Sequence, residues 1–382
     1  MEPLSDLDYV TSPYISYRRG TLDDLLRPAS YQGVPACELE VLDALRRPSS
    51  LATLAYRYPA DTLRELAAKQ WILPASSVWQ THNVTSLEIE VTTHCNWRCQ
   101  FCPVSEAPKQ PHSMSLELFE EILVKAVQLG TVTGVSINSY NEPTADPLFE
   151  ERARMIARVG LKLILHTNGS QLDEARLRML QKLEVLDYLC FNLPSVEPDE
   201  FKRLTGVSAR NLSRSQAAIE AALALGLPVH ISVNGTAQEL AANLPPIQQM
   251  YASRLREPLM AWETSDRCGL MRNRYHLGID IADPLAGCSN VLNWLFISFE
   301  GKCFICCEDY QQKEVFGHIS DGSLHQILTS EAAQLLRKRV FGAADSSPDF
   351  LCRHCSLMKS RVERVRELAH STAAIPRPHL AP

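Results

Sequence analysis

Residues 93–103 have the sequence Thr93-His94-Cys95-Asn96-Trp97-Arg98-Cys99-Gln100-Phe101-Cys102-Pro103, which places three cysteines in one short stretch. Thiolates are the ligands that iron–sulfur clusters require, and a fourth cysteine normally completes a four-iron site. The next cysteine, Cys190, is far away in the sequence. This stretch can therefore hold three irons of a four-iron cluster and leave the fourth open to a small molecule. The alternating run at 87–91 just before it predicts a strand, so the cysteines stand in a loop that follows a strand.

A zinc ion and three unrelated cysteines are the alternatives to the cluster. Zinc sites favour paired C-x-x-C motifs with four ligands close together. Only one such pair, Cys99 and Cys102, occurs in this loop. The spacing therefore favours an iron–sulfur cluster over zinc.

The spacing of these cysteines, with the aromatic Phe101 just before the last of them, resembles the motif of the radical S-adenosylmethionine (SAM) superfamily. In that superfamily the open iron chelates SAM, and one electron from the [4Fe-4S] cluster splits SAM into methionine and a 5′-deoxyadenosyl radical, which removes hydrogen from a substrate. The resemblance implies that Cys95, Cys99 and Cys102 are the metal ligands and catalytic residues. It also implies that Phe101 lies beside the adenine, and that an electron donor such as flavodoxin or ferredoxin is a partner.

Composition restricts the class of protein. The 382 residues are 45% hydrophobic and 21% charged, as in globular proteins with ample core. The formal net charge of −6 argues against electrostatic binding of nucleic acid or of a membrane surface. The sequence shows no signal-peptide pattern and no run of about 18 apolar residues. Twelve cysteines without a secretion signal predict a cytoplasmic protein that binds metal or keeps reduced thiols.

Strand and helix patterns alternate from about residue 86 to 270. The predicted strands span 87–91, 132–139, 161–166, 185–192, 229–233 and 259–263. The predicted helices span 116–129, 148–159, 172–183, 213–225 and 246–256. This alternation predicts an α/β fold with a parallel sheet and helices outside it. It matches the partial (β/α)6 barrel of the superfamily, and we assign this domain to residues 85–275.

Polar residues stand at the ends of these predicted strands, where the chemistry of such folds gathers. By the resemblance, Glu142 accepts from the SAM ammonium group, and Asn141 beside it replaces a usual glycine. Asn168, in Thr167-Asn168-Gly169, and Asn192 match further SAM-contacting positions, the latter toward the carboxylate. Asn234 ends the fifth predicted strand. Asn168 and Asn234 have the alternative interpretation of turn residues.

Residues 1–84 predict a small winged-helix-like domain. Three predicted helices precede a short strand at 70–74. The first spans 38–46, Pro48-Ser49-Ser50 offers an N-cap for the second, and Asp61 can cap the third at 62–70. Ten acidic against eight basic residues up to position 85 argue against DNA binding. The placement resembles peptide-recognition modules that precede some radical SAM maturases and bind a leader peptide as an added edge strand. A domain with only a packing role is the alternative.

A second cysteine region spans 276–358. Its order resembles the twitch form of the SPASM extension, which implies one auxiliary [4Fe-4S] cluster. The implied metal ligands are Cys288, Cys306, Cys352 and Cys355. Cys303 or Cys307 can replace Cys306 in this assignment, because side chains reverse direction at each step of a strand. Structural zinc is again the alternative, and residues 359–382 predict a C-terminal helix and tail.

These features predict a radical SAM enzyme whose substrate is a ribosomally synthesised precursor peptide that is crosslinked, epimerised or oxidised. The alternative enzyme is a dehydrogenase, epimerase or decarboxylase of a small sugar, cyclitol or nucleoside. A redox-sensing regulator is a third interpretation, which the large β/α region disfavours. Glu263 and Arg267, beyond the last predicted barrel strand, are the polar candidates on the substrate side.

Overall fold

The computed structural model describes residues 4–18, 20–275 and 277–369. The chain divides into two compact units. We call residues 84–278 and 294–324 the sheet unit, and residues 1–83, 279–293 and 325–382 the terminal unit. The predicted C-terminal tail after residue 369 lies outside the described residues.

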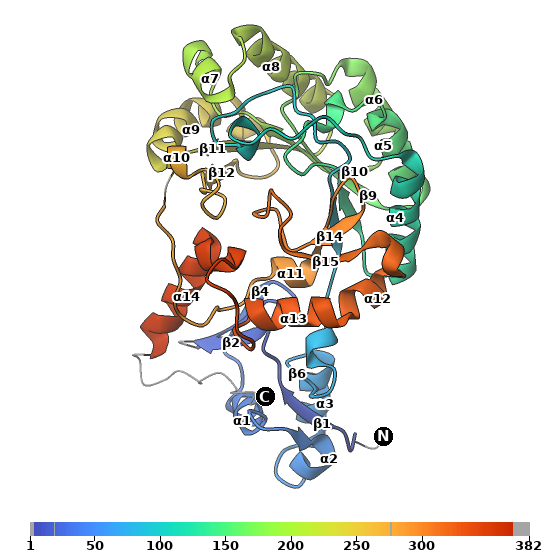
Figure 1. Ribbon diagram of the computed structural model, residues 1–382, viewed down its shortest axis with the longest axis vertical. Coiled ribbons are helices and arrows are strands. Elements are labelled where there is room, and N and C mark those ends of the chain that lie inside the picture. The colour runs from blue at the N-terminus through green and yellow to red at the C-terminus, as the bar shows by residue number, and fades with distance from the viewer. Residues whose placement is uncertain (1–3, 19, 276, 370–382) are drawn as a thin grey trace. The chain divides into compact units, whose positions relative to one another are not determined.

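A nine-stranded sheet in the order β12-β11-β10-β9-β8-β7-β13-β14-β15 forms the sheet unit (Figure 1). The six strands from β7 to β12 are parallel, and each pairs with the next in sequence. These strands are β7 (Ser86–Ile89), β8 (Gly134–Ser136), β9 (Lys162–Thr167), β10 (Leu186–Asn192), β11 (Val229–Gly235) and β12 (Met260–Glu263). The predicted six β/α units are therefore confirmed.

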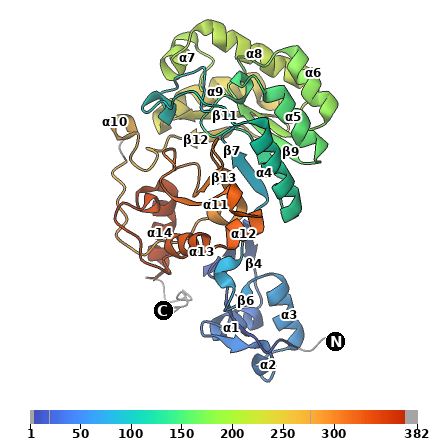
Figure 2. The same cartoon turned by 45° about the vertical axis from the view of Figure 1, so that its right-hand side comes forward.

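Helices cover one face of this sheet, as Figures 1 and 2 both show. They are α4 (Leu116–Leu129), α5 (Phe149–Arg158), α6 (Glu174–Leu183), α7 (Pro198–Thr205), α8 (Ala209–Ala224) and α9 (Ala237–Tyr251). Alternate strand residues, such as Leu163, Leu189 and Ile231, are fully buried and form the core. The opposite, inner face of the strands carries polar side chains, which are described below.

Two helical segments differ from the prediction. The sequence pattern starts a helix at Pro246, because proline favours the first turn of a helix. The structure instead begins α9 at Ala237, where Thr236 and Glu239 form a capping box. Helix α7 was not predicted, although Pro198 begins it and Gly206 ends it in the left-handed conformation.

The SPASM-like region extends the same sheet. Strand β13 (Trp294–Ile297) runs parallel to β7 on the edge opposite β8. Strands β14 (Lys302–Phe304) and β15 (Val315–His318) continue the sheet as antiparallel neighbours. The predicted hairpin around Glu300-Gly301 is confirmed, with Gly301 at φ 93° in the turn.

The terminal unit joins the two ends of the chain. Its sheets are β5-β1-β6 and β2-β3-β4. The strands are β1 (Asp8–Thr11), β2 (Ile15–Arg18), β3 (Thr21–Asp24), β4 (Ala29–Gln32), β5 (Ser49–Ser50) and β6 (Ile72–Pro74), and the helices are α1 (Ala36–Ala44), α2 (Leu51–Leu54), α3 (Ala60–Ala68), α11 (Asn290–Asn293), α13 (Glu331–Val340) and α14 (Ser356–Ala369). Helix α12 (Leu324–Thr329) begins where the sheet unit ends, and α10 (Arg272–Tyr275) lies in the sheet unit.

Long-range contacts hold the terminal unit together. Arg337 of α13 is buried and donates to the carbonyl oxygen of Trp79 at 2.8 Å. Asn293 of α11 donates to the carbonyl oxygen of Leu25 at 2.8 Å. The short strands β1–β4, which precede the predicted helices, had no sequence prediction.

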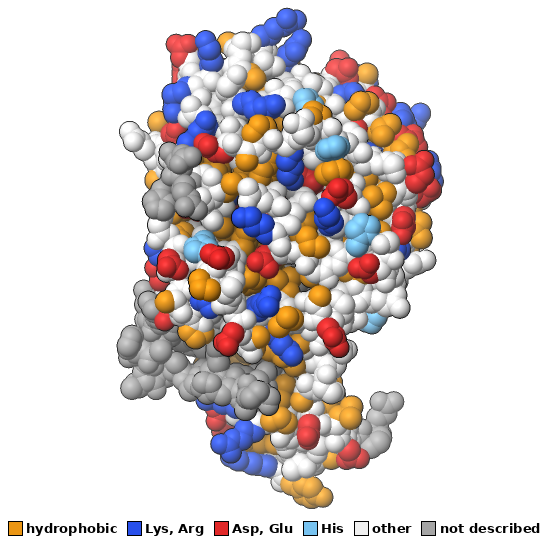
Figure 3. Space-filling view, viewed as in Figure 1, with side chains coloured by type: hydrophobic (Ala, Val, Ile, Leu, Met, Phe, Trp, Pro, Cys, Tyr) orange, Lys and Arg blue, Asp and Glu red, His pale blue; other side chains and the backbone are white. Residues whose placement is uncertain are grey.

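Acidic and basic side chains are interspersed over the face of the molecule in Figure 3. Among the described residues, no helix combines the length and apolar character that a membrane crossing requires.

Candidate active site

The cysteine loop follows β7 and is fixed by backbone and side-chain contacts. The amides of Arg98 and Gln100 donate to the carbonyl oxygens of Thr205 and Leu204 at 3.1 and 2.8 Å. Trp97 is 1% exposed and its ring meets Phe201 of α7 edge-on at 5.2 Å. The Arg98 guanidinium donates to the Cys95 carbonyl oxygen at 2.6 Å. These contacts hold the backbone of the cysteine loop against the end of α7.

The three thiols of this loop are enclosed and electrostatically coupled. Burial, followed by the charges of Glu142 and Cys102, raises the pKa of Cys95 to about 12. Burial and the neighbouring Cys102 and Cys95 raise the pKa of Cys99 as well. A metal centre reverses this trend, because a coordinating thiol loses its proton. Three buried thiols whose charges disfavour one another therefore fit a cationic metal group.

The type of ligand in this loop bears on whether it holds a zinc ion or a cluster. A tetrahedral zinc ion would draw four donors to about 2.0–2.3 Å. A multi-iron cluster spaces its thiolates more widely, and thiolate is its natural ligand. The donor set of Cys95, Cys99 and Cys102 therefore fits an iron–sulfur cluster.

Glu142 lies beside this loop in a preformed polar cradle. It is 2% exposed, and its amide donates to the His94 carbonyl oxygen at 3.0 Å. Its Oε1 accepts from the amide and hydroxyl of Thr144 at 3.0 and 2.6 Å, and from the hydroxyl of Thr167 at 2.6 Å. Its Oε2 accepts from the Asn168 amide at 2.7 Å. Burial raises the pKa of Glu142, and these donors partly offset that effect.

Asn168 connects this cradle to the cysteine loop. Its Nδ2 donates to Oδ1 of Asn96 at 2.8 Å, and Asn96 donates in turn to Ser170 Oγ at 3.0 Å. The structure therefore brings together the cysteines, Glu142 and Asn168. Their assignment to SAM stays a prediction.

The other predicted cofactor-binding residues are arranged differently. Asn141 turns back on its own strand end, accepting from the Ser139 amide at 2.6 Å and donating to the Ile137 carbonyl oxygen at 3.2 Å. Asn234 donates to Oδ1 of Asn192 at 2.9 Å, which pairs the ends of β11 and β10. Phe101 is 7% exposed in the cysteine loop. Asn141 therefore bonds to its own strand end, whereas Asn192 and Asn234 form a polar pair at the ends of β10 and β11.

A cluster on the inner face of the sheet escaped the sequence analysis. His166 of β9 and Tyr188 of β10 are 3.0 Å apart between Nε2 and the phenol oxygen, and His230 of β11 lies against the Tyr188 ring at 4.9 Å. Burial lowers the pKa of His166 to about 4 and raises that of Tyr188 to about 12. The imidazole is therefore neutral, and its Nε2 shares a hydrogen bond with the phenol. Polar residues that alternate with leucines in otherwise apolar parallel strands were the available signal.

Glu88 of β7 adds a titratable group to this inner face. Burial raises its pKa to about 8, which a hydrogen bond from Ser139 and the charge of Arg267 partly offset. The folded protein thus keeps a proton on Glu88 that the unfolded chain releases above its ordinary pKa of 4.5. The resulting stability is complete below that value and is lost as the pH rises to about 8.

We expect Glu88→Gln to remove this pH dependence, since the amide stays neutral. Between about pH 5 and about pH 8, the Tm of the wild type should fall by a few degrees more than the Tm of the variant. Thermal unfolding of both proteins at the two pH values measures this difference. Parallel Tm curves would show that Glu88 is ionised in the folded protein.

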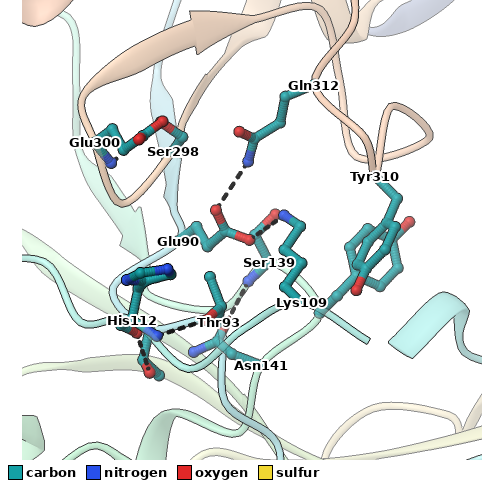
Figure 4. A network of polar contacts seen from close by, with 12 residues as sticks. Glu90, Thr93, Lys109, His112, Ser139, Asn141, Ser298, Glu300, Tyr310 and Gln312 are labelled. Atoms are coloured by element: carbon teal, nitrogen blue, oxygen red, sulfur yellow. Dashed lines mark hydrogen bonds and ion pairs between the residues drawn. The ribbon is translucent and has the colours of Figure 1, made fainter. Parts of the chain in front are cut away.

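A polar network joins the end of β7 to the extension of the sheet (Figure 4). Glu90 is 1% exposed, and it accepts from Lys109 Nζ at 2.5 Å and from Gln312 Nε2 at 2.8 Å. The Lys109 ammonium lies 4.7 Å from the ring centre of Tyr310, whose hydroxyl donates to the Ala107 carbonyl oxygen at 2.8 Å. The segment after the cysteine loop is thereby fixed to the turn between β14 and β15.

The predicted auxiliary ligands are divided between the two units. Cys306 follows β14 in the sheet unit, whereas Cys288, Cys352 and Cys355 belong to the terminal unit. Cys303 is fully buried in β14, and Cys307 is partly exposed. The grouping of four of these thiols around one auxiliary cluster stays a prediction.

The two candidates for the substrate side differ in position. Arg267 forms an ion pair with Glu308 at 2.5 Å, and its guanidinium lies 5.2 Å from the Tyr140 ring centre. Glu263, at the end of β12, is exposed. Arg267 is therefore fixed by contacts with Glu308 and Tyr140, whereas the Glu263 side chain faces solvent.

Two family models match the chain. The radical SAM superfamily model matches residues 89–237, and the SPASM model, an iron–sulfur cluster-binding domain, matches residues 288–356. A tungsten-containing aldehyde ferredoxin oxidoreductase cofactor-modifying protein of Pyrococcus furiosus is 30% identical over 107 residues, or 28% of this chain and 30% of that protein. A GTP 3′,8-cyclase of Pseudomonas savastanoi is 34% identical over 160 residues, or 40% and 45% of the two chains. The chain thus spans less than half the length of these curated relatives.

Solved structures share the fold over a larger part of the chain. SuiB of Streptococcus suis, bound to precursor peptide SuiA, superposes with a TM-score of 0.57 at 14% identity, covering 92% of this chain and 94% of that one. The anSMEcpe structure with bound AdoMet gives 0.53 at 15% identity, covering 78% and 90%. The two matched domains imply a SAM-binding four-iron cluster together with auxiliary iron–sulfur binding. The chain therefore contains a radical SAM domain and a C-terminal SPASM domain.

Proposed function

We propose that this protein is a radical SAM maturase of a ribosomally synthesised peptide. When bound, the cluster supplies the electron that splits SAM into methionine and a 5′-deoxyadenosyl radical. Cys95, Cys99 and Cys102 would hold three irons, and the Glu142 cradle would accept from the SAM ammonium group. The cluster of His166, Tyr188 and His230 offers hydrogen-bonding groups to a substrate bound on the inner face of the sheet.

The edge strand β4 is the observation that supports a peptide substrate. β4 ends the β2-β3-β4 sheet, and all four of its residues are exposed. Such an edge presents backbone donors and acceptors that an extended peptide can pair with. Tyr31 on this strand is 39% exposed, and its ring meets Trp71 edge-on at 5.1 Å. An aromatic anchor beside an open edge suits a leader peptide. The complex of SuiB with its precursor peptide, on the same fold, adds support.

The polar inner face keeps a small-molecule substrate as the second candidate. A relative from Niallia circulans, 28% identical over 108 residues, is a SAM-dependent 2-deoxy-scyllo-inosamine dehydrogenase. The GTP cyclase relatives also act on a small molecule by name. A sugar, cyclitol or nucleoside would need no edge strand, so the two candidates make different predictions about β4.

Proline substitutions in β4 test the peptide proposal. Neighbouring strand residues direct their amides to opposite sides, so one of Ser30→Pro and Tyr31→Pro removes an outward donor and the other disrupts pairing with β3. The variant that keeps the wild-type Tm identifies the outward position. We expect it to bind a labelled leader, taken from a precursor encoded beside this gene, at least about tenfold more weakly.

Ser30→Thr is the matched control, because it keeps the amide and suits a strand. Fluorescence anisotropy on the full-length protein gives the affinities. Equal affinity of the control, the outward proline variant and the wild type would exclude β4 as the docking edge. Absence of leader binding by the wild type would favour the small-molecule candidate.

A further inference from the structure

Tyr140 adopts a backbone conformation that its side chain disfavours. Its φ is +65°, in the left-handed region, although it is a bulky aromatic residue. Arg267, which lies over its ring, is also left-handed, with φ +49°. A residue with a side chain is destabilised in this region, because its Cβ atom lies too close to the following carbonyl oxygen. Both partners of one contact are therefore strained, which calls for a compensating interaction or a functional constraint.

The side chain of Tyr140 supplies that interaction. Its hydroxyl donates to the carbonyl oxygen of Cys307, and its ring meets the Tyr310 ring edge-on at 5.2 Å. Arg267, above the same ring, pairs with Glu308, which also accepts from Ser265 Oγ at 2.9 Å. These contacts converge on residues 307–310, immediately after the predicted auxiliary ligand Cys306. All of them lie within the sheet unit.

The other end of the same segment belongs to the predicted SAM site. Glu142 stands two residues after Tyr140 and anchors the cradle of Thr144, Thr167 and Asn168. The chain between them is short, and Asn141 closes it onto the end of β8. A displacement of the Glu142 backbone is therefore expected to move the Tyr140 backbone as well. The Tyr140 side chain in turn contacts the backbone of Cys307, the residue after Cys306.

We propose that Tyr140 is a positioning residue that couples occupancy of the SAM site to the surroundings of Cys306. This inference rests on the proposed roles of Glu142 at SAM and of Cys306 at the auxiliary cluster. The potential and spectrum of an iron–sulfur cluster depend on nearby hydrogen bonds and solvent exposure. The hydroxyl fixes the carbonyl group of Cys307, the residue after Cys306, and the ring contacts Arg267, which pairs with Glu308 of the same turn. A SAM-induced shift of the Glu142 segment would thus alter the auxiliary cluster.

Tyr140→Phe removes the hydrogen bond to Cys307 and keeps the ring. The reconstituted full-length protein is titrated by electron paramagnetic resonance with and without SAM. Replacing Cys95, Cys99 and Cys102 together with alanine assigns the auxiliary signal. We expect SAM to shift the auxiliary midpoint potential in the wild type, and this SAM-dependent shift to be lost in Tyr140→Phe. The affinity of Tyr140→Phe for SAM should stay close to that of the wild type.

Tyr310→Phe is the matched control, since its hydroxyl bonds to the Ala107 carbonyl oxygen instead. It should keep the SAM-dependent shift. Tyr140→Gly removes the ring together with its contacts to Tyr310 and Arg267, so it should lose the shift. The Tm should also fall, because relief of the left-handed strain offsets only part of the lost packing. A shift that survives in both Tyr140 variants, or is missing from the wild type, would overturn the coupling. A wild type with no auxiliary signal would instead refute the assignment of that cluster.

Discussion

Replacing Cys99 with alanine is expected to abolish the reductive cleavage of SAM. Cys99 is the middle cysteine of the loop and is 8% exposed. After burial, the neighbouring Cys102 and Cys95 are the causes that raise its pKa. A cluster held by three thiolates cannot spare one of them. The rate of 5′-deoxyadenosine formation should fall by far more than the roughly 10–100-fold that loss of a metal's outer-shell partner costs. Anaerobic turnover with dithionite, together with iron analysis, measures this.

Cys37→Ala is the matched control for that substitution. Cys37 is exposed on α1 in the terminal unit, away from both cysteine regions in sequence. The variant should keep its iron content and its rate of SAM cleavage. A Cys99→Ala protein that still makes 5′-deoxyadenosine at the rate of the control would remove the loop from the active site.

The second large effect is expected from Glu142→Gln. The substituted amide presents an NH2 group on one side, and each carboxylate oxygen of Glu142 now accepts a backbone amide, from Thr144 or from Asn168. In either orientation one backbone donor therefore faces another donor. An unsatisfied buried donor costs about 1–3 kcal/mol. The negative charge that would attract the SAM ammonium group is lost as well.

We therefore expect Glu142→Gln to weaken SAM binding by about 10–100-fold and to lower the Tm, since charged hydrogen bonds contribute about 1.5–3 kcal/mol. Equilibrium dialysis of the reconstituted protein gives the affinity. Glu150→Gln on α5 makes the same chemical change at a surface ion pair with Arg154 and should have little effect. Unchanged SAM affinity in Glu142→Gln would place the ammonium group elsewhere.

The sheet was predictable because local and global signals agree there. Apolar residues in β9 to β11 form short runs between turn residues, as buried parallel strands do. Helix α4 was predicted with its observed bounds, because Ser115 caps it and Gly130 ends it in the left-handed conformation. The start of α9 was wrong because Pro245 and Pro246 lie inside the helix, where their sequence signal is that of a beginning.

The site was predictable only where spacing in the sequence carries the chemistry. Cys95, Cys99 and Cys102 lie within one loop, so their grouping needs no knowledge of the fold. His166, Tyr188 and His230 come from three strands and meet only because the strands are in register. The contact of Tyr140 with Cys307 joins residues 167 positions apart. No local sequence pattern predicts a contact between residues so far apart.

The most direct test of the account is SAM cleavage by the protein reconstituted with iron and sulfide under anaerobic conditions. With dithionite as the reductant, mass spectrometry should detect 5′-deoxyadenosine in the wild type and Cys37→Ala, and none in Cys99→Ala. The spectrum of the wild type should show four-iron clusters. Zinc bound at Cys95, Cys99 and Cys102, or no 5′-deoxyadenosine even with the precursor peptide supplied, would contradict the account.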